Sequence, residues 1–301
     1  MSTMTNRERL LKVLGGGIPD CVPVAPDFSN MIPARLTGKP FWDLYLYNDP
    51  PIWEAYIACA KHFNIDSLMD GYFPFEWPGD PKWNDEKERY IVYRDKERIV
   101  TQRCSTTYGR KKWDDTVDIY YVADPPTFGV PPYKIGLSVV PTRYEPIEGI
   151  KPVNCGMSGL QKIKRMMGEQ GLVGVRFTWS TIAHDVESVY YFADHPEELE
   201  KIKEKRIEDI ERRFMDLKAM KKEERPDFLC VGSSGTLIFQ TPQFFYEHVF
   251  PFVRYAIELA GRIGIPTHVH SCGPEKELVR IFAEESNLTV IDPLEIPHMG
   301  D

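Results

Sequence analysis

The chain has 301 residues and a formal net charge of −8, from 37 Lys and Arg against 45 Asp and Glu. This length is sufficient for one α/β barrel, and the acidic balance argues against nucleic acid as a partner, because phosphate binding requires clustered basic residues. No apolar run reaches the roughly 18–20 residues of a bilayer span, and the charged N-terminus lacks the apolar core of a secretory signal.

The first 70 residues predict two helices and two strands. Thr5 and Glu8 have the spacing of a capping box, which opens a short helix that ends at three glycines. The segment 21–27 is expected to form a short buried strand with prolines at its margins. A second helix is predicted over 51–63, where apolar residues repeat at helical spacing, and a second strand over 65–69.

Residues 90–153 follow a different pattern. Short runs rich in β-forming residues alternate with turn residues, and three proline-rich patches follow them. Residues 94–97 have the composition of a hairpin tip between two alternating runs. We therefore interpret 90–153 as an inserted antiparallel lobe, separate from the parallel core.

Strand and helix alternate again from residue 160 onward, which predicts a parallel sheet covered by helices. Helices are expected at 160–167, 196–220, 241–259 and 274–285, and strands at 171–179, 228–231, 266–270 and 288–291. With the two earlier strands, six core strands are readable. The predicted fold is one α/β barrel domain over 1–301 with the β-rich insertion at 90–153. An open doubly wound sheet is the weaker alternative, because the only glycine-rich run precedes the first strand.

The most informative segment ends the fifth predicted core strand. Side chains alternate along a strand, so His268, His270 and Cys272 share one face. Residues two apart can bind one ion, whereas four apart is about 13 Å and too far. The metal pair is therefore His268/His270 or His270/Cys272, and the second is favoured because active sites of parallel barrels lie at the carboxyl ends of strands. Imidazole and thiolate together suit zinc, whereas a buried cysteine beside a hydrogen-bonded histidine is the structural alternative.

These residues carry a family resemblance. The His270-Ser-Cys272-Gly273 motif resembles the uroporphyrinogen decarboxylase superfamily, and more narrowly its cobalamin-dependent methyltransferases with an HxCG zinc motif. Five other segments are similar to that family: 5–10, 19–23, 241–251, 264–266 and 292–301. The resemblance runs over most of the chain and is weakest in the β-rich lobe.

The resemblance implies a TIM-type (β/α)8 barrel and a methyl transfer between a methylated corrinoid on a partner protein and a folate or small-thiol acceptor. It makes zinc the activator of the acceptor and His270 and Cys272 its ligands. Glu295 is the candidate for a displaceable oxygen ligand, with a structural salt bridge as the alternative. The family's third zinc ligand, a cysteine on the last strand, has no counterpart before Asp301. We therefore expect a C-terminally truncated barrel with six of its strands readable.

Further candidates for cofactor contacts follow predicted strands or lie near them, namely Asn30, Asp70, Trp179, Ser233 and Ser234. Carboxylates and amides can hydrogen-bond a pterin or a corrinoid edge, an aromatic ring can pack on a planar cofactor, and a Gly-Ser-Ser-Gly turn can bind an anion through its amides. Asp27, after the first predicted strand, is assigned a catalytic role together with Glu295. Ordinary turn chemistry and core packing are the alternatives.

Three functions remain open at this stage. The first is a zinc-dependent methyltransferase that uses a methylated corrinoid, and the second is a non-catalytic barrel relative that binds a partner or a planar ligand. The third, a decarboxylase of the porphyrinogen type, is disfavoured because 25–35 offers a single arginine for a substrate with many carboxylates. Six dispersed cysteines without a CxxC pair predict a cytoplasmic location, and the sequence is compatible with a homo-oligomer.

Overall fold

The computed structural model describes residues 3–26, 28–71, 73–80, 87–107 and 110–301. By its internal contacts the chain divides into two compact units. The parallel-sheet unit comprises Met1–Asp27, Asn64–Asp80 and Cys155–Asp301, and the antiparallel-sheet unit comprises Phe28–Phe63 and Pro81–Asn154. The chain therefore leaves the parallel-sheet unit twice and returns to it twice.

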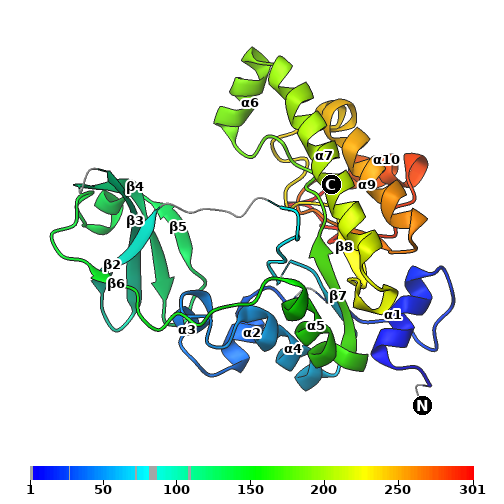
Figure 1. Cartoon of the computed structure of the whole chain (residues 1–301), viewed down its shortest axis with the longest axis horizontal. Helices are drawn as coiled ribbons and strands as arrows, with labels where there is room; N and C mark the ends of the chain where they lie inside the picture. Colours follow the sequence, from blue (N-terminus) through cyan, green and yellow to red (C-terminus); the bar gives the residue numbers. More distant parts are fainter. Residues whose placement is uncertain (1–2, 27, 72, 81–86, 108–109) are drawn as a thin grey trace. The chain divides into compact units, whose positions relative to one another are not determined.

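The parallel-sheet unit is built on a curled sheet whose strand order is β1-β7-β8-β9-β10. Figure 1 labels two of its strands, β7 and β8. Each neighbouring pair is parallel. The strands are β1 (Ser67–Met69), β7 (Gly171–Arg176), β8 (Phe228–Cys230), β9 (Thr267–His270) and β10 (Val290–Asp292). A curled parallel sheet of five strands is compatible with part of a barrel, and five of the six predicted core strands are confirmed.

The predicted strand at 21–27 is wrong for the residues described there. Residues 21–26 have no strand structure. Pro23 and Pro26 lack the N–H groups that a sheet ladder needs. The amide of Val24 instead donates to Asp66 Oδ2 at 2.7 Å, so a side chain, and not a neighbouring strand, binds this segment.

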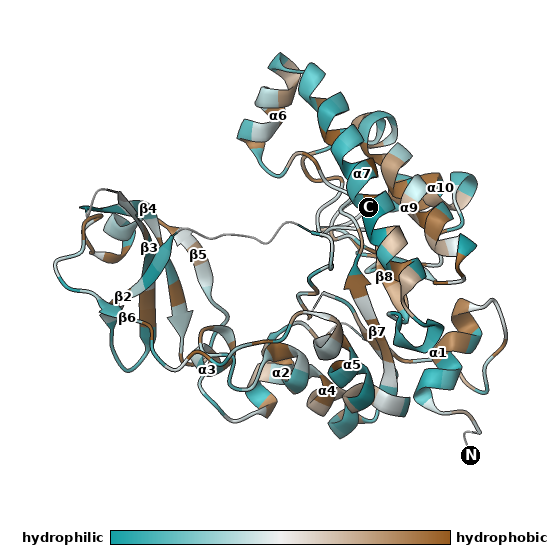
Figure 2. Ribbon diagram, viewed as in Figure 1, coloured by the Kyte–Doolittle hydropathy of each residue, from teal (hydrophilic) through white to brown (hydrophobic). Residues whose placement is uncertain are grey.

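Helices cover the parallel sheet, and α1 and α5 pack against β7. The longest, α7, is mostly hydrophilic in Figure 2 and buries a stripe that includes Leu199, Ile210 and Leu217, as expected for an outer helix. None of the described helices combines the length and apolar character that crossing a membrane would require. The helices of this unit are α1 (Asn6–Leu14), α5 (Met157–Met167), α6 (Val186–Asp194), α7 (Glu197–Ala219), α8 (Pro242–Phe244), a π-helical turn (Phe245–Val249), α9 (Phe250–Arg262) and α10 (Lys276–Glu285), with short 3-10 turns at Gly168–Gln170 and Lys222–Glu224.

The predicted capping box of α1 is confirmed. The Thr5 hydroxyl accepts from the Glu8 amide at 3.1 Å, and the Glu8 carboxylate accepts from the Thr5 amide at 2.8 Å. The helix is then tied to the sheet by Arg7, which donates twice to the Asp227 carboxylate just before β8. The N-terminal helix thus holds the amino ends of the strands, opposite the edge where the candidate site lies.

The antiparallel-sheet unit contains a sheet of order β5-β4-β3-β2-β6. The predicted hairpin tip is confirmed, because β2 and β3 pair antiparallel and the Asp95 amide donates to the Arg98 carbonyl at 3.0 Å. Leu46, Ile91, Ile99 and Tyr120 form a core cluster between the sheet and the helical segment. The elements are α2 (Met31–Leu36), α3 (Phe41–Tyr45), α4 (Ile52–Phe63), β2 (Glu88–Arg94), β3 (Arg98–Thr107), β4 (Arg110–Tyr121), β5 (Thr127–Val130), a 3-10 turn (Pro132–Ile135) and β6 (Glu145–Pro146).

Candidate metal centre

Ionisable side chains gather at the carboxyl edge of the parallel sheet. The register pairs Cys230 with His268 and His270 with Asp292, so residues from three neighbouring strands stand at nearly the same level. Asp70 follows β1 directly and reaches the same cluster. The carboxyl edge is where parallel α/β folds place ligand-binding residues.

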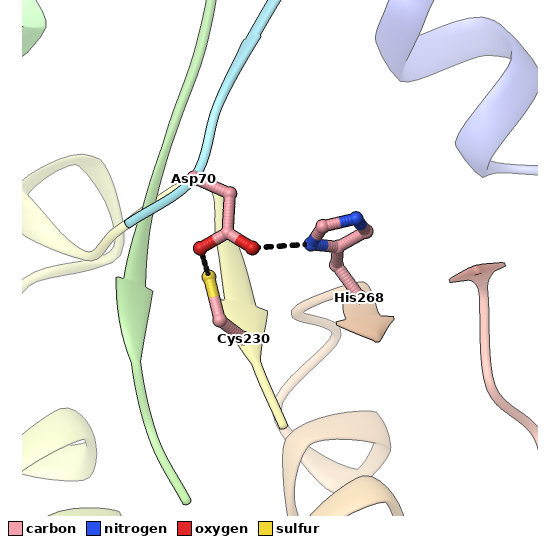
Figure 3. Close-up of side chains that lie close together, drawn as sticks. All are labelled: Asp70, Cys230 and His268. Carbon is pink, nitrogen blue, oxygen red and sulfur yellow. Dashed lines mark hydrogen bonds and ion pairs between the residues drawn. The ribbon is translucent and has the colours of Figure 1, made fainter. Parts of the chain in front are cut away.

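Asp70, Cys230 and His268 form a triad whose side chains point toward one another, with Cys230 and His268 buried and Asp70 partly buried (Figure 3). The Cys230 thiol donates to Asp70 Oδ1, and His268 Nδ1 lies 2.8 Å from Asp70 Oδ2. One ligand atom from each residue lies within 4.8 Å of the other two. These three side chains could therefore hold a metal ion.

Asp292 joins the triad to the predicted zinc motif. His268 Nε2 donates to Asp292 Oδ2 at 2.9 Å, and His270 Nδ1 donates to Asp292 Oδ1 at 2.9 Å. A carboxylate can only accept, so each ring carries a proton on the nitrogen that faces Asp292. The other nitrogen of each ring can bind a metal once any proton on it is displaced.

His270 and Cys272, the predicted zinc pair, lie close together. Cys272 Sγ is 3.3 Å from His270 Nε2. Zn–N and Zn–S bonds of about 2.0 and 2.3 Å at a tetrahedral angle place the two ligand atoms about 3.5 Å apart. The donor types and the spacing therefore fit a zinc ion with little movement, and the ring nitrogen opposite the metal already has the carboxylate partner that is usual for histidine ligands.

The charges of the cluster are strongly coupled. Burial lowers the pKa of His268, but its contacts with Asp292 and Asp70 outweigh burial and raise this pKa to about 9. The hydrogen bond to Asp292 also raises the pKa of His270. Burial raises the pKa of Asp292, but the two histidines outweigh it and hold the pKa far below its usual range. Without a metal, the carboxylates of Asp70 and Asp292 thus lie beside a His268 imidazolium.

The Cys230 side chain is fully buried, and its thiol stays protonated. Burial raises the pKa of Cys230 well above its usual value, and the charge of Asp70 adds to this effect. Burial also raises the pKa of Asp70, but the His268 imidazolium outweighs it, so the pKa of Asp70 is lowered. A thiol in such surroundings becomes a thiolate only when a cation takes the place of its proton.

Glu295 lies close to the HxC segment without joining the triad. Its Oε2 accepts from the Gly273 amide at 2.7 Å, so its carboxylate contacts the residue after Cys272. This contact is a hydrogen bond to the backbone, whereas the sequence suggested either zinc ligation or a salt bridge. Asp27, the other predicted catalytic residue, lies outside the described residues.

The predicted cofactor-binding residues have separate surroundings. Ser233 is buried and its hydroxyl accepts from the Ser180 amide at 3.0 Å, whereas Ser234 is exposed. Trp179 is 42% exposed, and the Arg176 guanidinium lies 4.5 Å from its ring centroid. Asn30 belongs to the antiparallel-sheet unit, where it precedes α2. Only Asp70 of this group joins the metal-ligating cluster.

Sequence reasoning gave no role to Cys230 and Asp292, and it favoured the His270/Cys272 pair over a pair that includes His268. A positional signal was present, because Cys230 lies within a predicted strand near its carboxyl end and Asp292 directly follows one. That signal indicates an edge but does not indicate which residues meet there. The pairing became visible only with the register of β8, β9 and β10.

Comparison with known proteins adds no relative to this description. No protein-family model matches the chain, and no curated protein sequence does. The resemblance to the HxCG methyltransferases therefore rests on the motifs in the sequence.

Proposed function

We propose that the protein is a methyltransferase whose zinc ion is held by His270 and Cys272. The observation that carries the proposal is the 3.3 Å approach of Cys272 Sγ to His270 Nε2, on a ring whose other nitrogen donates to Asp292. This arrangement has a thiolate donor, an imidazole donor and a supporting carboxylate, which together are typical of zinc sites. The proposed fold is a TIM-type barrel of the uroporphyrinogen decarboxylase type.

When bound, zinc would supply Lewis-acid chemistry, which lowers the pKa of an acceptor thiol or polarises an acceptor group. With His270 and Cys272 as ligands, a four-coordinate zinc ion has two further coordination positions, one for Glu295 and one for the acceptor. We assign Glu295 the role of displaceable ligand, because its carboxylate already contacts the backbone next to Cys272. Because Asp292 accepts from Nδ1 of His270, it favours the tautomer in which the lone pair of Nε2 is available to the metal.

The proposed reaction moves a methyl group from a methylated corrinoid, carried by a partner protein, to a small thiol or a folate nitrogen. Trp179 is the candidate platform for a planar group, since its ring is partly exposed and adjoins the carboxyl end of β7. Asp70 and the amides of Ser233 and Ser234 are the proposed polar contacts. We expect this reaction to take place in the cytoplasm.

The proposal is tested with methylcobalamin in place of the corrinoid protein and with 2-mercaptoethanol or tetrahydrofolate as acceptor. The expected result is zinc-dependent loss of the methylcobalamin spectrum under anaerobic conditions, with the methylated acceptor as product. Chelation of zinc or the Cys272→Ser substitution should reduce this to the uncatalysed rate. Cys21→Ser is the matched control, because Cys21 is an exposed cysteine. Transfer by Cys272→Ser at the wild-type rate, or no transfer to either acceptor by zinc-loaded protein, would contradict the proposal.

A further inference from the structure

We infer that Asp70, Cys230 and His268 form a second, buried metal site for a divalent cation of the zinc type, separate from the His270/Cys272 site. The inference assigns Asp70 to a metal instead of the polar contact proposed above, and it concerns a site separate from the zinc ion of the proposed methyl transfer. It rests on the geometry of the triad and on its hydrogen bonding (Figure 3).

The donor set is the first argument. The triad offers one carboxylate oxygen, one sulfur and one imidazole nitrogen, all within 4.8 Å of one another. A set of mixed hard and soft donors suits a borderline cation such as zinc better than magnesium or calcium, which prefer oxygen ligands alone. Three protein ligands also leave a fourth tetrahedral position for another group.

The second argument is the position of a buried ring nitrogen. His268 is 2% exposed, and its Nε2 is engaged by Asp292. Its Nδ1 forms an ion pair with Asp70 Oδ2 at 2.8 Å (Figure 3). A ring nitrogen that lies beside a carboxylate and a thiol at this depth can bind a cation in place of its proton.

The charge of the site is the third argument. A divalent cation bound by the Asp70 carboxylate and a Cys230 thiolate forms a neutral group, which suits a buried position. Among the charges that act on Cys230, the Asp292 carboxylate and the Arg176 guanidinium are opposite in sign. Cation binding would displace the thiol proton and the proton of the His268 imidazolium to solvent.

The two sites are distinct because Asp292 stands between them. His268 gives Nε2 to this carboxylate and turns Nδ1 toward Asp70 and Cys230, whereas His270 gives Nδ1 to it and turns Nε2 toward Cys272. One carboxylate thus sets opposite tautomers in two histidines of the same strand. The buried site joins the ends of β1, β8 and β9, so we expect its cation to stabilise the parallel-sheet unit.

The test counts zinc on the full chain. Protein stripped with chelator is reloaded with zinc alone, dialysed and measured by mass spectrometry for the wild type, Cys230→Ser, Cys272→Ser and the double variant. The expected result is about two zinc ions per chain in the wild type, about one in each single variant and none in the double variant. A wild type with one zinc that Cys230→Ser retains and Cys272→Ser loses would overturn the inference while sparing the proposed function.

The reverse outcome separates the two claims. A single zinc that Cys230→Ser loses and Cys272→Ser retains would support the buried site and contradict the zinc site of the proposed function. Because Cys230 is a core residue, Asp70→Asn gives a second measurement with the same expected loss of one ion. Cys59→Ser is the control for changing a buried cysteine, and it should keep both ions. Full retention of zinc in Asp70→Asn and in folded Cys230→Ser would also overturn the inference.

Cobalt provides an independent readout of the sulfur ligand. Co²⁺ bound by a thiolate gives a charge-transfer absorption band in the near ultraviolet, and this band reports each Co–S bond separately from activity. In the Cys272→Ser background the remaining band should disappear on adding Cys230→Ser. A band that is unchanged by Cys230→Ser in this background would contradict the assignment of Cys230 as a ligand.

Discussion

Replacing Asp292 by asparagine should weaken zinc binding at the carboxyl edge by about 10- to 100-fold, the usual effect of losing a carboxylate behind a histidine ligand. The carboxylate accepts from His268 and from His270, each at 2.9 Å. An amide has one accepting oxygen and one donating nitrogen, so it can satisfy only one of these rings. If the amide donates to His270 Nδ1, the proton of that ring moves to Nε2 and blocks the position that faces Cys272.

The size of this loss of zinc affinity follows from the one hydrogen bond to a charged group that Asp292→Asn removes, which is worth about 1.5–3 kcal/mol. The Asp292 side chain is 44% exposed, so screening by solvent places the effect in the lower part of that range. Since about 1.4 kcal/mol corresponds to a factor of ten, we expect at least a tenfold loss of affinity. Competition with a chromophoric chelator measures it directly. Asp209→Asn, on the outer helix α7, is the control, and a loss of less than about threefold in Asp292→Asn would refute the reasoning.

Three further predictions concern stability. In metal-stripped protein the pKa of His268 is raised from 6.5 to about 9, so its contribution is complete below about pH 6.5 and is lost as the pH rises through about 9. Urea unfolding should show a loss of about 2–3 kcal/mol over this window, and a His268→Gln variant that shows the same loss would contradict the assignment. The Asp227 side chain is buried and accepts from the Arg7 guanidinium and from a strand amide. Asp227→Asn should therefore lower the free energy of unfolding in urea by about 3 kcal/mol. A loss under about 1 kcal/mol would contradict a stabilising role for this ion pair. A Cβ on Gly232 would stand 2.8 Å from a backbone nitrogen of β9, so Gly232→Ala should lower the melting temperature by several degrees. The control is Gly261→Ala on α9, where a Cβ meets nothing within 4 Å; it should be neutral or stabilising, and equal melting temperatures for the two variants would contradict the close approach of β8 and β9.

Local patterns predicted most of the parallel-sheet unit. Helix α1 follows from its capping box, and α7 from an apolar stripe on a charged helix. The strand expected at 21–27 is wrong because Pro23 and Pro26 interrupt its strand-forming residues and have no N–H to donate to a neighbouring strand. The helix α6 was missed although Asp185 and Ser188 form a capping box before it. The short helices α2 and α3 were also missed, because helices of five or six residues depend on tertiary packing more than on local pattern.

The candidate site was predictable in part. Alternation along one strand places His268 and His270 on the same face, and the strand end favours the pair with Cys272. In the structure β9 ends at His270, so Cys272 is already in the following turn, where its sulfur approaches the imidazole. The partners Cys230 and Asp292 come from strands separated in sequence by long helical connections. Their meeting depends on register, which the sequence of a single strand does not specify.

The most direct test of the central claim is an anomalous difference map at the zinc edge, from crystals of the zinc-loaded protein. The account predicts a peak within bonding distance of both His270 Nε2 and Cys272 Sγ, at about 2.0 and 2.3 Å respectively. A second peak at Asp70, Cys230 and His268 is expected from the further inference and does not affect this test. Zinc-loaded crystals with no peak between His270 and Cys272 would contradict the proposed centre.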